Sequence, residues 1–175
     1  MSATTMSLMP RNRAVTAALA VAAGGAATVL GAFYFQYGLG ILPCPLCLEQ
    51  RKVYYVAIPL ALVVAIVAAW RAPRPVVVAG LSVLALVFLF GAGLAAYHSG
   101  VEWKWWPGPQ ECTGPMNNVG SAKDLLNQLN TFSPVRCDEV QWSFLGLTLA
   151  GYDVLVSLAL AIVALWGARA SFKRG

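Results

Sequence analysis

The hydrophobic pattern of the chain consists of four long apolar runs separated by polar segments. Three runs contain no charged residue and cover residues 14–37, 53–70 and 75–97. The fourth run, residues 149–168, contains one acid near its start, Asp153. Because about 20 apolar residues cross the hydrocarbon core of a bilayer, each run is long enough for a transmembrane helix. The pattern predicts an all-α membrane protein, a four-transmembrane-helix bundle in a single integral membrane domain over residues 1–175.

The first run also has the basic flank of a secretory signal peptide, because Arg11 and Arg13 precede it. Its apolar part, however, is longer than the roughly 7 to 15 residues of a signal-peptide core, and no clear small-residue cleavage site follows it. We therefore interpret residues 14–37 as a retained helix.

Composition and charge support this topology. The chain is 59% hydrophobic and only 11% charged, whereas an ordinary soluble domain is roughly 25% charged. The segments before the first run, between the second and third, and after the fourth contain basic residues and no acid: Arg11, Arg13, Arg71, Arg74, Arg169, Lys173 and Arg174. The positive-inside rule then predicts cytoplasmic termini and outward-facing loops at residues 38–52 and 98–148. Topology explains the net charge of +5, and nothing supports nucleic-acid binding.

The second outward loop contains a helical pattern of its own. Ser121 and Asp124 have the spacing of a capping box, with Asp in place of Glu. Apolar residues then recur at helical spacing: Leu125, Leu126, Leu129 and Phe132. The pattern predicts a short amphipathic helix that ends before Pro134 and lies either on the outer leaflet or against the rest of the loop. Three tryptophans that follow the third run are typical of an interfacial aromatic belt: Trp103, Trp105 and Trp106.

All four cysteines fall in the two outward loops: Cys44, Cys47, Cys112 and Cys137. Disulfides persist outside the cytoplasm, so the even count predicts disulfide chemistry, although four cysteines allow three pairings. A zinc site built from all four is an alternative. Structural zinc sites usually use two closely spaced pairs, whereas Cys112 and Cys137 are far apart in sequence, and we predict no metal site.

The first outward loop contains the sequence LPCPLCLEQR, residues 42–51. Proline disfavours helical geometry in the residue before it, so the second helix is expected to begin no earlier than Pro45 or Leu46. Cys47 then lies in or beside the first helical turn, where the helix dipole and the Cys-x-x-Cys pattern favour a thiolate. Arg51 follows four residues later and shares the helix face of Cys47. The alternative is a local disulfide or ordinary loop cysteines, with Arg51 only anchoring the helix to headgroups.

Two further polar residues lie at the ends of predicted spans. His98, the only histidine, is at the outer end of the third run and is either a structural hydrogen-bonding residue or a neighbour of a bound cofactor. Asp153 is a functional candidate if it lies inside the membrane, but near the start of the fourth helix the dipole would tolerate it.

These features together resemble one family, the disulfide bond formation protein B (DsbB) family. The resemblance covers nearly the whole chain: four spans with both ends inside, Cys-x-x-Cys-x-x-x-Arg in the first outward loop, a separated cysteine pair in the second, and the sequence FLGL leading into the last helix. It implies a protein-disulfide oxidoreductase of the bacterial inner membrane. Such an enzyme reoxidises a periplasmic thioredoxin-like partner of the DsbA type and uses a membrane quinone, ubiquinone or menaquinone, as its acceptor.

The resemblance also implies roles for single residues. Cys112, paired with Cys137, would be attacked by the reduced partner, and Cys137 would then engage Cys44. Cys47 would be left as the thiolate that faces the quinone. Arg51 matches the family arginine that supports quinone binding, and His98 matches a position near the quinone ring. Both outward loops would then be periplasmic.

Two other classes of protein are alternatives. A vitamin K epoxide reductase-like enzyme has a similar bundle and a Cys-x-x-Cys, but there the loop cysteines come before that motif, and here the order is reversed. A non-catalytic four-span structural protein, with two permanent disulfides bracing its outer loops, would also fit the spans and the cysteine count.

Overall fold

The computed structural model describes residues 3–109 and 135–172, the first ten as backbone only. Its elements, in chain order, are α1 (Ala3–Phe33), the π-helical segment η1 (Tyr34–Gly38), α2 (Pro45–Ala69), α3 (Arg74–Glu102), β1 (Ser143–Phe144), β2 (Leu147–Thr148) and α6 (Leu149–Phe172). The predicted amphipathic helix at residues 121–132 and Cys112 lie outside the described residues.

Four helices in the described part of the chain are long and apolar enough to cross a membrane, which confirms the predicted number of spans. Each of these helices extends beyond its apolar run. Helix α2 begins at Pro45, before the uncharged run that starts at Val53, and α3 continues to Glu102, past the end of its run at Tyr97. The extra turns contain charged and polar side chains that interrupt the apolar pattern without interrupting the helical backbone hydrogen bonds.

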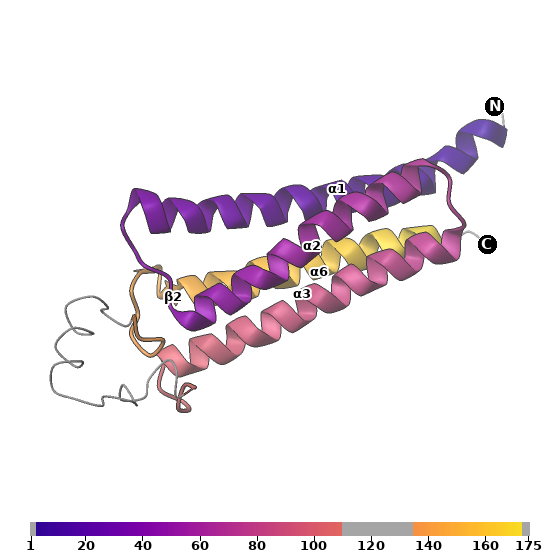
Figure 1. The fold of residues 1–175 in the computed structure, drawn as a ribbon. Coiled ribbons are helices and arrows are strands. Elements are labelled where there is room, and N and C mark those ends of the chain that lie inside the picture. Colours follow the sequence, from indigo (N-terminus) through magenta and orange to yellow (C-terminus); the bar gives the residue numbers. More distant parts are fainter. Residues whose placement is uncertain (1–2, 110–134, 173–175) are drawn as a thin grey trace, which may run out of the picture.

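The four helices form one antiparallel bundle (Figure 1). Helix α3 lies along α6, α1 contacts both α2 and α6, and α2 also contacts α3. Helix α1 starts and α6 ends at the same end of the bundle as the link between α2 and α3. The opposite end carries Cys44 and Cys47 at the start of α2 and the short hairpin before α6, and we call it the cysteine end.

The hairpin is a feature that the sequence pattern did not predict. Strands β1 and β2 pair antiparallel, with Phe144 opposite Leu147. The two residues between them, Leu145 and Gly146, have φ angles of 50° and 80°, as a two-residue type I′ turn requires. The sequence FLGL therefore forms a turn that precedes α6, and α6 itself starts at Leu149, as predicted for the fourth span.

Small residues bring the helices close together inside the bundle, as is typical of membrane helices. A Cβ atom added at Gly167 would lie 2.5 Å from the Cβ atom of Ala17 on α1, whereas one added at Gly93 would meet nothing within 4 Å. Gly167 therefore permits the close approach of α6 to α1.

Replacing Gly167 by alanine is expected to destabilise the bundle by about 1 to 3 kcal/mol, because the added methyl group overpacks the contact with α1. The matched change, Gly93→Ala, adds the same methyl group to an open helix surface and should leave the stability unchanged or slightly raise it. Thermal unfolding in detergent micelles measures both changes. Equal melting temperatures for the two variants would contradict the prediction.

Candidate functional site

The site begins at the first turn of α2. Cys44 is the N-cap of this helix in an extended conformation, with φ −74° and ψ 165°, and Pro45 occupies the first helical position. The Cys44 sulfur accepts a hydrogen bond from the backbone N–H of Cys47 at 3.2 Å. The predicted helix start and the position of Cys47 in the first turn are confirmed. The capping atom is the sulfur of Cys44, which satisfies the backbone N–H of the third helical residue.

The two cysteines of this turn form a close pair. Both are free thiols, and their sulfur atoms lie 2.7 Å apart. Cys44 is only 2% exposed, whereas Cys47 is half-buried. When one of the two cysteines is ionised, the thiol of the other can donate a hydrogen bond to its thiolate. The two sulfur atoms are also close enough to form a disulfide.

His98 of α3 completes the surroundings of Cys44. Its Nε2 atom lies 3.6 Å from the Cys44 sulfur, and its Nδ1 atom lies 2.8 Å from the amide nitrogen of Gln50 on α2. When the Gln50 amide donates to Nδ1, the imidazole proton resides on Nε2 and points at the sulfur. His98 thus contacts Cys44, at the cysteine end of the bundle.

These hydrogen bonds favour the ionised form of Cys44. The thiol of Cys47 donates to the Cys44 sulfur, and His98 and the backbone N–H of Cys47 add two further donors. Together they outweigh the effect of burial and lower the pKa of Cys44 to about 5. The sequence had indicated Cys47 as the thiolate of the pair, because it is in the helical turn. In the reduced protein the capping geometry favours Cys44 instead.

A titration of the reduced protein tests this assignment. A lowered pKa means that the Cys44 thiolate is present above about pH 5 and becomes protonated below it. The measurement is the ultraviolet absorbance of the thiolate, and the Cys44 signal is the absorbance of the wild type minus that of Cys44→Ala. This signal should persist below neutral pH and disappear near pH 5. A transition near the ordinary thiol pKa of about 8.5 would contradict the prediction.

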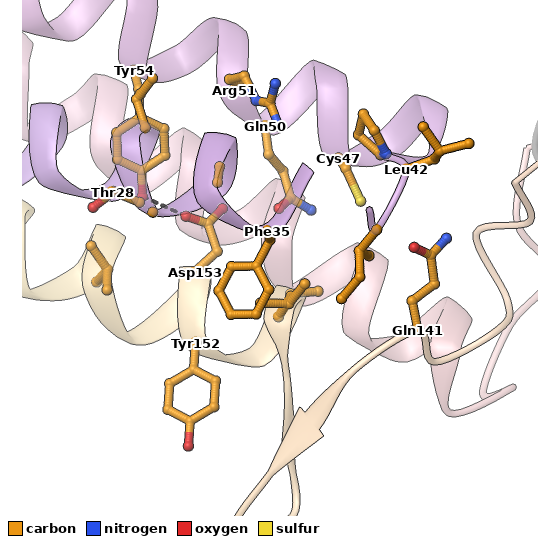
Figure 2. A pocket seen from close by; sticks show the side chains of 18 residues that line it. Thr28, Phe35, Leu42, Cys47, Gln50, Arg51, Tyr54, Gln141, Tyr152 and Asp153 are labelled. Carbon is orange, nitrogen blue, oxygen red and sulfur yellow. Dashed lines mark hydrogen bonds between the residues drawn. The ribbon is translucent and has the colours of Figure 1, made fainter. Parts of the chain in front are cut away.

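A cavity of about 230 Å³ lies between α1, α2 and α6, beside the cysteine pair (Figure 2). Its wall is mostly apolar and contains Cys47 at one end and Tyr54 with Asp153 at the other. An engineered cavity of about 150 Å³ is large enough to bind benzene. The cavity therefore has room for a substituted six-membered ring next to Cys47.

Arg51 lies on the wall of this cavity together with Cys47, which confirms that the two residues share a helix face. Its guanidinium donates to the side-chain oxygen of Gln36 at 2.8 Å and lies over the Phe33 ring at 4.9 Å. Both partners come from the end of α1 and η1. They hold the positive charge against the cavity, where Arg51 is the one cationic residue among the described lining residues.

The segment between α3 and α6 reaches the site through Cys137. This residue is disulfide-bonded and fully buried, and it packs in a small cluster with Cys44, Leu46 and Val101. Because Cys137 is disulfide-bonded, its sulfur is not available as a zinc ligand in this state. The loop cysteine is instead held beside the first cysteine pair.

A different metal arrangement is geometrically available. The ligand atoms of Cys44, Cys47 and His98 all lie within 4.8 Å of one another, and thiolate with imidazole suits zinc or copper(I). The two sulfur atoms would have to separate before both could bind one ion. We assign no metal to these residues.

Three residues of the site went unrecognised in the sequence. Gln50 contacts His98, Gln36 contacts Arg51, and Tyr54 donates to Asp153 across the bundle. The signal for Gln50 and Tyr54 was their spacing, since positions three and seven residues after Cys47 continue its helix face. Gln36 gave no such signal, because its role depends on how α1 packs against α2.

The chain is similar to known proteins over most of its length. A family model described as "Disulfide bond formation protein DsbB" matches residues 13–167. A protein of Azoarcus sp. (strain BH72), named "Disulfide bond formation protein B", is 34% identical over 167 residues, which cover 92% of this chain and 95% of that protein. A protein of the same name from Polaromonas sp. (strain JS666) is 30% identical over 143 residues, covering 75% and 77%. No solved structure is significantly similar to the chain.

Proposed function

Because the chain belongs to the disulfide bond formation protein B family, we propose that this membrane protein is a thiol oxidase that passes electrons from a periplasmic dithiol protein to a quinone. The dithiol protein is a thioredoxin-like oxidase of the DsbA type. The quinone is ubiquinone or menaquinone. The observation that carries the proposal is the cavity beside Cys47, which combines an apolar wall, a thiol and one guanidinium.

The four cysteines act as two pairs in this proposal. The reduced partner attacks Cys112 of a Cys112–Cys137 disulfide, and Cys137 is released as a thiolate. Cys137 then attacks Cys44 of a Cys44–Cys47 disulfide, and Cys47 becomes the leaving thiolate. The burial of Cys137 in one cluster with Cys44 supports this exchange, because the attacking and attacked sulfurs must meet.

The proposed quinone site occupies the cavity between α1, α2 and α6. A bound quinone would place its ring against Cys47, so that the thiolate can donate electrons to it. Charge then develops on the ring oxygens, and Arg51 is positioned to stabilise that charge. The apolar wall suits the ring and the first part of the tail. His98, which contacts Cys44, acts on the sulfur side of this site.

The proposal includes an orientation in the bacterial inner membrane. The basic segments at both termini and between α2 and α3 favour the cytoplasm, which places the cysteine end in the periplasm, where the partner is found. A membrane-impermeant thiol reagent applied to intact cells should then label reduced Cys47 from outside.

The proposal is tested by adding a reduced thioredoxin-like dithiol protein and a soluble ubiquinone analogue to the purified protein in detergent micelles. We expect one quinone to be reduced for each dithiol oxidised, with many turnovers per enzyme. No turnover with several dithiol partners and both quinone classes, while all four cysteines stay oxidised, would favour a structural four-span protein instead.

A further inference from the structure

Asp153 lies at the inner end of the cavity, and its role rests on the quinone reduction proposed above. Oxidation of the Cys44–Cys47 dithiol releases two electrons and two protons, and conversion of a quinone to a hydroquinone consumes both. The thiols supply the electrons at one end of the cavity. The protons must reach two ring oxygens that point in opposite directions, inside a wall that is mostly apolar.

Asp153 is placed in the second turn of α6 and lies on the cavity wall. Its Oδ1 atom accepts a hydrogen bond from the hydroxyl of Tyr54 on α2, as Figure 2 shows. The Tyr54 oxygen lies 3.0 Å from the hydroxyl of Ser157. Because the single Tyr54 proton is directed to Asp153, Ser157 is the donor in that second bond. The network therefore has a fixed direction, from Ser157 to Tyr54 to Asp153.

The other carboxyl oxygen of Asp153 has no partner in the network. Its Oδ2 atom is buried and forms no hydrogen bond with any described residue. Since Oδ1 is occupied as an acceptor, a proton carried by this carboxyl resides on Oδ2. An ionisable side chain inside a membrane span is costly and usually marks a functional site. A role limited to accepting the Tyr54 proton would not require a carboxyl, because the amide oxygen of an asparagine would accept it equally well.

The position of Asp153 along the cavity fits a bound ring. Tyr54 follows Cys47 by seven residues, which is about 10 Å along the helix axis. Figure 2 shows Tyr54 and Asp153 at the end of the cavity opposite Cys47. A quinone ring lying between them has one oxygen near Cys47 and Arg51 and the other directed toward Asp153.

We propose that Asp153 donates a proton to the distal oxygen of the quinone. The O–H bond at Oδ2 breaks, a new O–H bond forms on the ring oxygen, and the carboxylate later recovers its proton from solvent. The two electrons come from Cys44, which its hydrogen bonds hold as a thiolate, and from Cys47 as the two sulfur atoms form the disulfide. The proton of the Cys47 thiol passes to the proximal ring oxygen, and the proton that Cys44 lost earlier has gone to solvent. In sum, a dithiol and a quinone become a disulfide and a hydroquinone. Tyr54 is a positioning residue that holds the carboxyl with Oδ2 available.

The test compares Asp153→Asn with Asp153→Glu in the steady-state assay with a soluble ubiquinone analogue. Asparagine keeps the acceptor for Tyr54 but cannot donate a carboxyl proton. We expect kcat to fall about 100-fold, the lower end of the effect of a general acid, with the KM for quinone unchanged. Glutamate should recover most of the lost rate. The control is Glu49→Gln, which removes an exposed acid of α2 outside the cavity and should leave kcat unchanged.

Wild-type kcat in Asp153→Asn would overturn the role of Asp153 and leave the quinone proposal intact. A rate that falls in Asp153→Asn and is not recovered by glutamate would indicate a structural role and would also overturn it. If Asp153→Asn does not fold, the pH profiles of kcat for wild type and Asp153→Glu decide. Donation by this carboxyl requires the loss of rate at alkaline pH to shift between the two proteins, and identical profiles would overturn the role of Asp153. Failure of the wild type to reduce any quinone would overturn both proposals.

Discussion

Replacing Cys47 by serine is expected to reduce quinone reduction to the rate of the uncatalysed reaction. Cys47 is the cysteine of the first pair that lies on the wall of the 230 Å³ cavity, and a hydroxyl is a far poorer electron donor than a thiolate. The substitution also prevents the Cys44–Cys47 disulfide. Both the transfer of electrons to the quinone and the exchange with the second cysteine pair therefore stop.

The measurement is quinone reduction with a reduced thioredoxin-like partner, together with capture of the partner in a mixed disulfide. In Cys47→Ser the partner should still be captured, because Cys112 is proposed as the site of its attack. In Cys112→Ser that capture should be lost, which makes this variant the matched control. Turnover by Cys47→Ser at the wild-type rate would show that electrons leave the protein by another route.

The spans and the start of α2 could be predicted because each depends on local signals. Long uncharged runs indicate membrane helices, and Pro45 determines where α2 can begin. The same local signals do not show how far a helix continues beyond its apolar run, since residues such as His98 and Glu102 end the run while α3 continues. The hairpin before α6 was missed for a different reason. Its turn uses a positive φ at Leu145, a residue type that gives no turn signal.

The pairing of site residues could be predicted only within one helix. The shared face of Cys47 and Arg51 follows from a spacing of four residues, and the cavity confirms it. The contact of His98 with Cys44, by contrast, joins residues 54 positions apart and depends on how α2 packs against α3. The same holds for Tyr54 and Asp153, which are 99 positions apart. No periodicity within one segment encodes such contacts.

Arg51 provides the second prediction with a large effect. Its guanidinium lies on the cavity wall beside Cys47 and is held there by Gln36 and Phe33. Replacing Arg51 by methionine keeps much of the side-chain volume and removes the charge. Removal of one group that stabilises a developing negative oxygen costs about 10² to 10³-fold in rate. We expect a loss of this size in kcat/KM for the quinone, measured in the same assay.

A neighbouring cation is the matched control for this substitution. Lys52 follows Arg51 directly on α2, but its ammonium group is exposed, pairs with Glu49 and does not line the cavity. Lys52→Met therefore removes the same charge from the same turn and should leave kcat/KM within about twofold of wild type, because exposed ion pairs contribute little. Equal losses in both variants would mean that the positive charge acts through the general field at the cysteine end. A loss confined to Arg51→Met would mean that the guanidinium acts at the cavity itself, where its contacts with α1 hold it next to the reacting ring.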